Sequence, residues 1–378
     1  MNILTIAGTR PELIRLSEII KKLDLVSNNV FVYTNQNPTP NLSDIFFSDM
    51  GIRQPDVIFD PPGSIFADQL GSMLVQLDRF LSMPFTLKFD KALILGDTNS
   101  ALLSILLARR GIPVYHIEGG NRCFSNLSPE EVNRNIVDHC VSKHLVYSER
   151  SKQNLLNEGI HISNIYTVGN PIIEVLDIQR GILENRFGAR DISGDAHDLL
   201  SDYNIECSFN KTTALCTIHR GETVSNRKSI EEIFLGLAEA CEEFNMEIIF
   251  PVHPKTKDFI NKWGIKVHEN IFLCEPVPFS VMNLLYDNCD LIITDSGTVC
   301  EEACILKIPC VILRDYSERL ECAEVGGYIL AGVPGFGKKV DFLGCIRASL
   351  LLPPNSSLPI EYLKKDVSDT IAKIMVGI

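Results

Sequence analysis

The chain has 378 residues, a length that predicts about two domains. Hydrophobic residues make up 45% of it and charged residues 22%, as is usual for a globular protein with a full core. The formal net charge of −13 argues against nucleic acid or an anionic membrane as a partner, and no apolar run is long enough to span a membrane.

The N-terminal segment has neither the basic region nor the small-residue cleavage site of a signal peptide, and we interpret it as a first buried strand. The twelve cysteines are scattered, mostly within apolar segments, and form no C-x-x-C pair. Buried, reduced thiols are the usual state of such cysteines. We therefore expect a cytoplasmic protein.

Apolar runs alternate with helical patterns along the chain. In the first half, strands are predicted at 3–7, 30–34, 91–95, 114–117 and 144–147, and helices at 11–22, 67–81, 99–110 and 129–140. In the second half, strands are predicted at 213–218, 247–252, 271–274, 291–294 and 310–313. Short apolar strands spaced by helices indicate parallel sheets that are covered on both faces.

This alternation predicts an α/β protein with two Rossmann-like, doubly wound domains facing a cleft. We place the first domain at residues 1–170 and the second at 171–358, and we expect the C-terminal helix at 359–378 to pack back on the first domain. Ligands of such sheets bind at the carboxyl ends of the strands. The residues that follow each strand are therefore the candidate site residues.

Three motifs follow strands of the first domain. GTRPE places Arg10 at a helix N-terminus, where backbone N–H groups favour anions, although an ordinary surface arginine is the alternative. GDTNS places Asp97 at a strand tip, where capping of the next helix is the alternative. HIEGG places Glu118 at another strand end, and Gly119 and Gly120 leave room for a ligand.

The helix after this stretch begins with the sequence SPEE. Ser128 and Glu131 have the spacing of a capping box, which predicts a structural role for Glu131. Glu130 has no such role and is the freer acid, although an ordinary ion pair with Arg134 four residues later is the alternative.

Cationic side chains follow the strands of the second domain. His219 and Arg220 follow one strand in TIHRGET, His253 follows the next in PVHPK, and RDYSER adds two more arginines. A lone histidine is usually structural. Several cations at the strand ends of one domain, however, explain how a chain of net charge −13 could bind an anion.

The segment TDSGTVCEEA is the most informative part of the second domain. A strand ends, residues 295–298 turn, and a helix begins that carries Glu301 and Glu302. Small residues at such a turn offer N–H donors to a diphosphate, and a carboxylate one helical turn later can accept from ribose hydroxyls. The chain has no G-x-G-x-x-G after a strand and no G-K-[ST] loop, which argues against nicotinamide and P-loop nucleotide chemistry.

The motifs GTRPE, GDTNS, HIEGGNR, PEEVNR, HR-x-E, PVHP and TDSGT-x-x-EEA occur here in the order found in the non-hydrolysing UDP-N-acetylglucosamine 2-epimerases. The chain resembles that family from residue 3 to about residue 330. The resemblance implies two Rossmann-like domains of the glycosyltransferase-B type, a homodimer, and a cytoplasmic role in the synthesis of bacterial surface polysaccharide precursors.

The resemblance also implies roles for single residues, and His253 matches the neighbourhood of the family's regulatory site. Catalytic or near-catalytic positions are matched by Arg10, Asp97, Glu118, Glu130 and His219. Substrate-binding roles are expected for Arg15, Arg122, His253, Ser296, Gly297, Thr298, Glu302 and Arg319.

The chain departs from the family pattern at four single positions. Arg15 stands where a lysine is usual, Gly119 where an alanine is usual, Thr298 where a glycine is usual and Leu320 where a proline is usual. An arginine in place of a lysine keeps the charge but changes the hydrogen-bond geometry.

A longer departure concerns regulation and the identity of the sugar. TNQNPTPNLSDIFF (34–47) stands where members activated by UDP-N-acetylglucosamine carry a glutamine-rich stretch. Pro38 and Pro40 disfavour a helix there, so we expect no requirement for an added activator. This segment and NRCF (121–124) resemble the branch that converts UDP-2-acetamido-2,6-dideoxy-L-talose to UDP-N-acetyl-L-fucosamine, which makes that sugar the alternative substrate.

The expected reaction is an elimination, because the C2 hydrogen of an N-acetylhexosamine is not acidified by a neighbouring carbonyl. Loss of UDP across C1–C2 gives a 2-acetamidoglycal, which takes UDP back with the proton on the other face. This chemistry needs an acid, a base and cations beside the diphosphate, but no metal or redox cofactor. Acid–base candidates are Asp97, Glu118 and Glu130, and charge-stabilising candidates are Arg10, His219 and Arg319.

Two alternatives belong to other functional classes. A glycosyltransferase of the same architecture would share the diphosphate cradle but would need an acceptor and no acid cluster. A UDP-sugar-binding protein without turnover would not need the three acids that the first domain carries.

Overall fold

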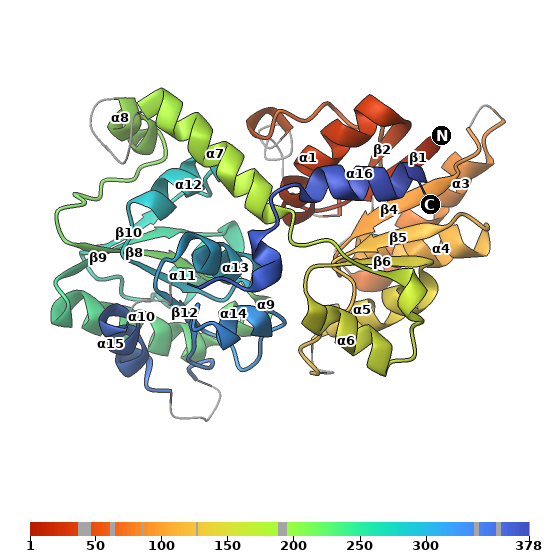
Figure 1. Ribbon diagram of the computed structural model, residues 1–378. Helices are drawn as coiled ribbons and strands as arrows, with labels where there is room; N and C mark the ends of the chain where they lie inside the picture. Colours follow the sequence, from red (N-terminus) through yellow and green to blue (C-terminus); the bar gives the residue numbers. More distant parts are fainter. Residues whose placement is uncertain are drawn as a thin grey trace. The chain divides into compact units, whose positions relative to one another are not determined.

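The computed structural model describes residues 1–36, 47–60, 65–84, 87–125, 128–187, 195–335, 340–352 and 357–377. It divides into two compact units (Figure 1): the first unit is Met1–Val175 with Ile360–Ile378, and the second unit is Leu176–Pro359. Each is built on a parallel sheet with helices on both faces, which confirms the predicted α/β class. Every helix within the described ranges is too short or too polar to cross a membrane.

The described part of the first unit contains a seven-stranded parallel sheet in the order β3-β2-β1-β4-β5-β6-β7. Its strands are β1 (Asn2–Ala7), β2 (Asn28–Tyr33), β3 (Val57–Ile58), β4 (Lys91–Leu95), β5 (Val114–Ile117), β6 (Lys143–Val146) and β7 (Ile165–Thr167). Its helices are α1 (Arg10–Val26), α3 (Phe66–Ser82), η1 (Asn99–Leu103), α4 (Ser104–Arg109), α5 (Pro129–Cys140), α6 (Glu149–Asn157), η2 (Ile162–Asn164), η3 (Ile360–Leu363) and α16 (Val367–Gly377), and α7 (Ile172–Phe187) leads into the second unit.

The described part of the second unit contains a six-stranded parallel sheet in the order β10-β9-β8-β11-β12-β13. Its strands are β8 (Thr212–Thr217), β9 (Met246–Pro251), β10 (Ile271–Cys274), β11 (Leu291–Thr294), β12 (Cys310–Ile312) and β13 (Ile329–Leu330). Its helices are α8 (Asp195–Ser201), α9 (Gly221–Val224), α10 (Arg227–Glu243), α11 (Pro254–Trp263), α12 (Phe279–Asp287), α13 (Gly297–Leu306), α14 (Leu320–Glu324) and α15 (Phe342–Leu351).

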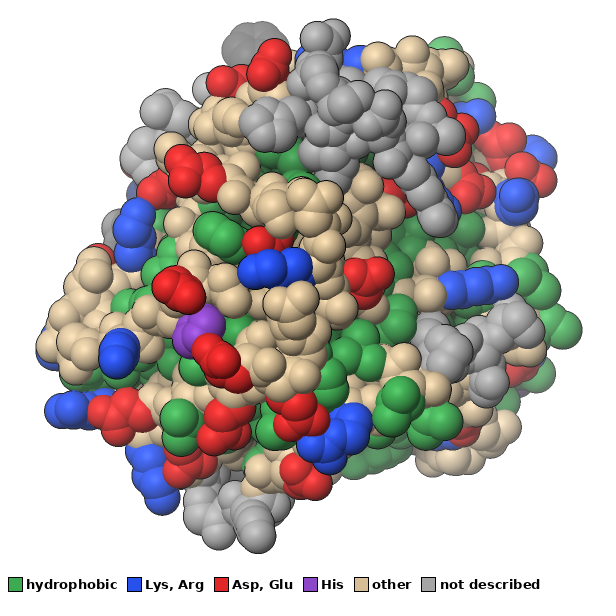
Figure 2. Space-filling view, turned by 90° about the vertical axis from the view of Figure 1, so that its left-hand side faces the viewer, with side chains coloured by type: hydrophobic (Ala, Val, Ile, Leu, Met, Phe, Trp, Pro, Cys, Tyr) green, Lys and Arg blue, Asp and Glu red, His purple; other side chains and the backbone are tan. Residues whose placement is uncertain are grey.

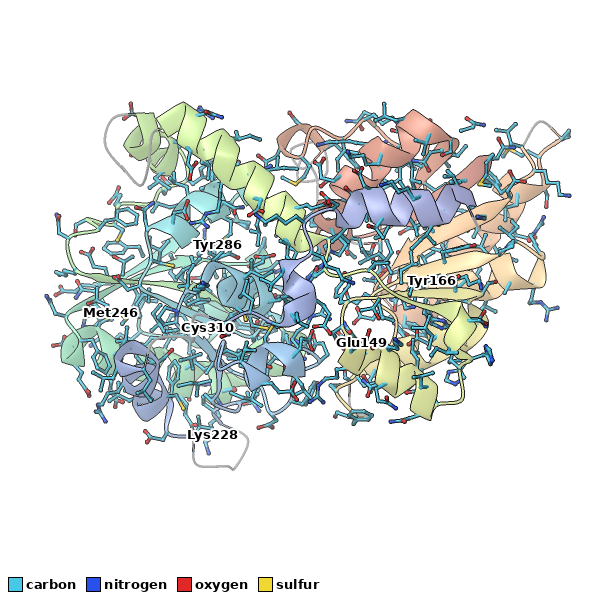
Figure 3. All side chains as sticks on the ribbon, in the orientation of Figure 1. Glu149, Tyr166, Lys228, Met246, Tyr286 and Cys310 are labelled. Atoms are coloured by element: carbon cyan, nitrogen blue, oxygen red, sulfur yellow. The ribbon has the colours of Figure 1, made fainter. Side chains whose placement is uncertain are left out.

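Burial of the central strands explains why the chain forms these sheets. All five residues of β4 and all four of β5 are buried, as expected when helices cover both faces of a parallel sheet. α1 begins with a proline in its first turn and buries apolar side chains at helical spacing on one face. In the second unit the interior includes the fully buried Tyr286 and Cys310 (Figure 3).

The C-terminal segment returns to the first unit, where α16 lies beside α1 (Figure 1). Lys22 of α1 pairs with Asp369 of α16 at 2.8 Å, and the Lys91 ammonium donates to the Met375 carbonyl at 2.7 Å. The sequence predicted a single helix that begins at residue 359, and this start is wrong. A short 3-10 turn, η3, comes first, and the helix begins at Val367.

Both sheets reverse their strand order once. In the first unit the chain moves outward from β1 to β2 and β3, and then from β4 to β7 on the other side. In the second unit the reversal lies between β8 and β11. Crevices at the carboxyl ends of such strand pairs are the usual ligand sites of doubly wound sheets. The fold therefore directs attention to the turns after β1, β4, β8 and β11.

The surface in Figure 2 is consistent with the acidic composition. On this face, acidic and basic side chains are interspersed, with small apolar areas between them.

Two helical glycines of the second unit give a stability test. A Cβ on Gly236 of α10 would lie 2.3 Å from the Phe342 ring, whereas one on Gly181 of α7 would meet nothing within 4 Å. We expect Gly236→Ala to lower the free energy of unfolding by about 1–3 kcal/mol through overpacking. Gly181→Ala should raise it by up to about 1 kcal/mol through helix propensity. Thermal unfolding midpoints should move in opposite directions, and equal shifts would contradict the packing described here.

Candidate functional site

Glu12 joins the two turns at the switch point of the first sheet. Its carboxylate accepts from the Gly8 and Thr9 N–H groups after β1, at 2.5 and 3.0 Å, and from the Thr98 hydroxyl after β4, at 2.6 Å. Burial raises the pKa of Glu12 to about 7, although these hydrogen bonds act in the opposite direction. Sequence reasoning missed this residue, yet its spacing from Thr9 is that of a capping box, which α1 does contain.

Gly8 shows how tightly this turn is packed. A Cβ there would lie 1.9 Å from the Ser100 hydroxyl oxygen and 2.3 Å from that of Thr34. Arg10 follows at the start of α1, and burial lowers the pKa of its guanidinium from the ordinary value. An anion beside Arg10 would stabilise its charge. Arg15, one turn further along α1, is buried.

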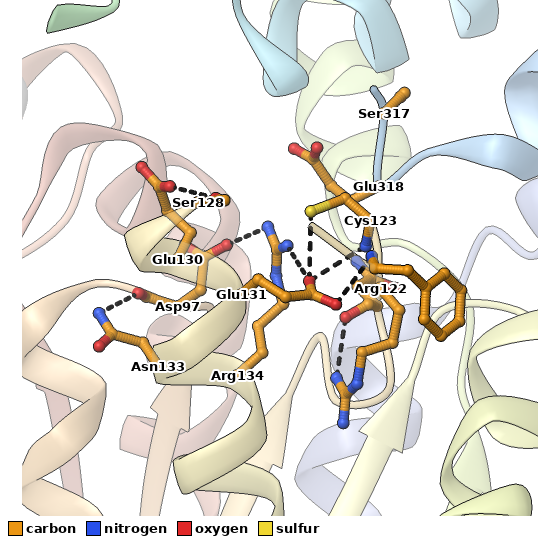
Figure 4. Close-up of polar contacts among 12 residues, drawn as sticks. Asp97, Arg122, Cys123, Ser128, Glu130, Glu131, Asn133, Arg134, Ser317 and Glu318 are labelled. Atoms are coloured by element: carbon orange, nitrogen blue, oxygen red, sulfur yellow. Dashed lines mark hydrogen bonds and ion pairs between the residues drawn. The ribbon is translucent and has the colours of Figure 1, made fainter. Parts of the chain in front are cut away.

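Asp97 follows β4 and is held by α5 (Figure 4). Its carboxylate forms an ion pair with Arg134, and its carbonyl accepts from the Asn133 amide at 2.8 Å. The helix cap is Thr98, whose side chain accepts from the N–H of Ser100, so the capping alternative for Asp97 is not what the structure contains. The Asp97 side chain remains 19% exposed and can therefore meet a ligand.

Glu118 follows β5 in a strained backbone conformation. Its φ is +75°, in the left-handed region that costs a non-glycine residue about 1–3 kcal/mol. The residue is buried, and the Tyr147 hydroxyl donates to its carboxylate at 3.1 Å. Strained residues of this kind concentrate at functional sites, because the surrounding structure must hold them in place.

The expectation that Gly119 and Gly120 leave room for a ligand is wrong. A Cβ on Gly119 would lie 3.1 Å from the Asp138 carboxylate, and one on Gly120 would lie 2.2 Å from the Ser151 carbonyl. Gly120 also has a φ of +76°. Close packing of the protein against itself is therefore the reason for both glycines.

Arg122 lies in a buried ion-pair cluster. Its guanidinium contacts the carboxylates of Glu158, at 2.6 and 2.8 Å, and Asp138, at 2.8 Å, and donates to the Asn121 carbonyl. The side chain is 1% exposed. These contacts stabilise the loop after β5, and the expected contact of Arg122 with substrate stays a prediction.

Glu131 does not form the predicted capping box (Figure 4). Its carboxylate accepts from the backbone N–H groups of Cys123 and Phe124, at 3.0 and 2.9 Å, and pairs with Arg134 at 3.0 Å. The Ser128 hydroxyl donates instead to Glu130, at 2.6 Å. Glu131 is structural, as predicted, but through a loop that sequence spacing could not reveal. Glu130 is half-buried at the start of α5.

Asp295 joins the two turns at the switch point of the second sheet. It follows β11, and its carboxylate accepts from the N–H groups of His219 and Arg220 after β8, at 3.1 and 2.9 Å. The His219 ring lies 3.4 Å from the same carboxylate, yet its side chain is 48% exposed. His219 is thus oriented from one side and open to a ligand on the other.

The turn expected at residues 295–298 is shorter than predicted, because α13 already begins at Gly297 with Ser296 as its N-cap. The Ser296 hydroxyl caps the helix by accepting from Thr298 and Val299 N–H, at 3.3 and 3.5 Å. A Cβ on Gly297 would lie 2.1 Å from a carboxylate oxygen of Glu318, so a larger residue does not fit. A helix N-terminus of this kind favours an anion.

Glu302 and Arg319, which were expected to contact the substrate, are both buried. Glu302 accepts from the Tyr286 hydroxyl at 2.5 Å, and Arg319 lies 3.3 Å from Glu301. His253, in contrast, is exposed and immediately precedes α11.

Part of the segment expected to govern regulation lies outside the described residues. This applies to residues 37–46, including Pro38 and Pro40, so the expected independence from an activator stays a prediction. Gln36, which precedes the gap, accepts from the N–H and hydroxyl of Ser100 at 2.9 and 3.0 Å.

Comparisons with known proteins point to one family. A family model described as UDP-N-acetylglucosamine 2-epimerase matches residues 22–335. A UDP-N-acetylglucosamine 2-epimerase of Methanocaldococcus jannaschii is 35% identical over 343 residues, which cover 88% of each chain. A UDP-2,3-diacetamido-2,3-dideoxy-D-glucuronate 2-epimerase of Pseudomonas aeruginosa is 30% identical over 338 residues, which also cover 88% of each chain. The solved structure of the M. jannaschii UDP-GlcNAc 2-epimerase with UDP-GlcNAc and UDP has a TM-score of 0.87 and 32% identity, with 99% of each chain covered.

The contacts of Glu131 give a prediction with a matched control. Both carboxylate oxygens of Glu131 accept from donors, one from Arg134 and the Cys123 N–H and the other from the Phe124 N–H. In Glu131→Gln an NH₂ group replaces one of these oxygens and faces donors. We therefore expect a loss of about 2 kcal/mol of folding free energy. Glu130→Gln still accepts from Ser128 and should change stability by less than about 0.5 kcal/mol. Denaturant unfolding of both variants measures the difference, and equal losses would refute the assignment.

Proposed function

The chain belongs to the UDP-N-acetylglucosamine 2-epimerase family, and we propose that it interconverts UDP-N-acetylglucosamine and UDP-N-acetylmannosamine. Membership confirms the resemblance seen in the sequence and makes the chain an epimerase. The observation that carries the proposal is the presence of two carboxylates, Asp97 and Glu118, at the ends of the neighbouring strands β4 and β5. The named relatives support a UDP-N-acetylated sugar as substrate and do not favour the L-talose derivative.

We propose that the first unit moves the C2 proton. One carboxylate takes the proton from C2, the electron pair forms the C1–C2 double bond, and the C1–O bond breaks with its electrons to the diphosphate. A second acid then returns a proton to the opposite face as UDP adds back. Asp97 is partly exposed and paired with Arg134. Glu118 is buried and bonded to Tyr147, and Glu130 is the third candidate.

The second unit would supply the site for the leaving diphosphate. The N-terminus of α13 presents a helix dipole and backbone N–H groups, and the half-exposed His219 can add a donor or a positive charge. Arg10, in the first unit, is the further cationic candidate. Stabilisation of the diphosphate lowers the barrier because its negative charge grows as the C1–O bond breaks.

Two further parts of the proposal concern the cell. The product would serve as a precursor of surface polysaccharides, made in the cytoplasm by a homodimer.

A glycosyltransferase of the same architecture is the competing class. Incubation with UDP-N-acetylhexosamines without an acceptor separates the two classes, because a transferase would leave the sugar unchanged.

Isotope incorporation tests the elimination. In D₂O we expect deuterium at C2 of the recovered UDP-N-acetylmannosamine and of the UDP-N-acetylglucosamine, because the abstracted proton exchanges with solvent. NMR of the nucleotide sugars measures the label. Product that forms without deuterium would exclude this scheme, and no product from any UDP-N-acetylhexosamine would exclude the proposed function.

Substitution of the two acids tests their role. We expect Asp97→Asn and Glu118→Gln each to lower kcat by at least about 100-fold, the scale of lost acid–base catalysis. Asp78→Asn is the matched control in the same unit, since Asp78 forms an exposed pair with Arg110 and should leave kcat unchanged. A variant of either acid that keeps full activity would remove that acid from the reaction.

A further inference from the structure

The His116 ring spans the ends of the two strands that carry the acids. His116 is fully buried on β5, two residues before Glu118. Its Nδ1 lies 2.8 Å from a carboxylate oxygen of Asp138, and its Nε2 lies 2.8 Å from the carbonyl oxygen of Gly96. Gly96 directly precedes Asp97. One ring therefore connects the turn that carries Asp97 to the turn that carries Glu118.

Asp138 fixes the far side of the Glu118 turn as well. Its other carboxylate oxygen accepts from the Gly120 N–H at 2.9 Å and from Arg122 at 2.8 Å. His116 and Gly120, two residues before and two residues after Glu118, are thus both bonded to the Asp138 carboxylate. Glu118 has a φ of +75°, and such a strained conformation persists only where its surroundings hold it.

The Asp138 carboxylate is held from several sides. One of its oxygens contacts the His116 ring, and the other accepts from the Gly120 N–H and contacts Arg122. Burial by itself would raise the pKa of Asp138, but the hydrogen bond from His116 and the charges of His116 and Arg122 lower it well below its usual range.

A buried cation accompanies this carboxylate. Arg122 contacts both Asp138, at 2.8 Å, and Glu158, at 2.6 Å. His144, on β6, lies 3.9 Å from Asp138, and burial lowers its pKa. Buried charges persist where they are paired in this way.

We propose that His116, held between Asp138 and the Gly96 carbonyl, is a positioning residue that fixes the Asp97 and Glu118 turns at the spacing that a two-acid reaction requires. This inference rests on the proposed epimerase function. His116 acts through the two turns, and the contacts of its ring nitrogens are to the protein itself.

The positioning role is tested by two substitutions of similar volume. His116→Gln keeps an amide donor for the Gly96 carbonyl, whereas His116→Met has none. We expect His116→Met to lower kcat by at least about tenfold with little change in KM, since a misplacement of about 1 Å can cost on the order of 100-fold. His116→Gln should recover most of this loss. Unfolding midpoints of both variants show that they are folded under the assay conditions.

The outcomes separate this inference from the proposed function. Equal kcat values for wild type and His116→Met would overturn the positioning role, as would equal losses in the two folded variants. If His116→Met does not fold, His116→Gln is compared with wild type, and a loss of kcat of about tenfold in that folded variant would overturn the role. If wild type turns over no UDP-N-acetylhexosamine, the proposed function fails, and the positioning role for that reaction fails with it.

Discussion

In each unit a buried carboxylate joins the two turns that flank the switch point of the sheet, and the candidate site of that unit is built on this contact. Glu12 accepts from two N–H groups after β1 and from Thr98 after β4. Asp295 accepts from two N–H groups after β8. The strand order reverses at these points, so the helices leave on opposite faces and the turns between them are not covered. Backbone donors in such turns need a partner, and the neighbouring turn provides it.

Helix α5 organises the remaining part of the first unit. Glu131, Arg134 and Asp138 recur at helical spacing, so they lie on one face, and all three are buried. This face reaches the loops after β4 and β5: Arg134 holds Asp97 after β4, and Glu131 and Asp138 hold two parts of the loop after β5, the backbone of residues 123 and 124 and the Glu118 turn. A buried polar face of this kind specifies positions more sharply than apolar packing, because each bond has a required partner and direction.

The arrangement explains how an acidic protein can serve an anionic substrate. The net charge of −13 is spread over the whole chain, whereas the turns after the strands carry Arg10 in the first unit and His219 in the second. Local fields at such sites depend on nearby charges and helix termini more than on the total charge. The acids that would move the proton are fixed in advance by ion pairs and backbone strain, so little reorganisation is needed during the reaction.

The sequence by itself determined the α/β class, the central strands and the positions at which functional side chains occur. Apolar runs with period and length typical of buried strands predicted β1, β4, β8 and β11 to within a few residues, and Asp97, Glu118, His219 and Ser296 follow strands as expected. Propensity and periodicity are local, so they can be read along the chain. The short edge strands β3, β7 and β13, of two or three residues each, carry no such period and were missed.

Only the tertiary structure decided which side chains pair. Arg122 is bonded to Glu158, 36 positions later, a pairing that the sequence did not indicate. Glu131 was expected to cap its own helix but holds a loop seven and eight residues earlier. His116 gave no signal in the sequence, because its partners at 96 and 138 belong to other elements. The physical reason is the strength of electrostatic pairing in a buried, low-dielectric interior: a charged group takes the best partner that the fold brings near, whatever its distance along the chain.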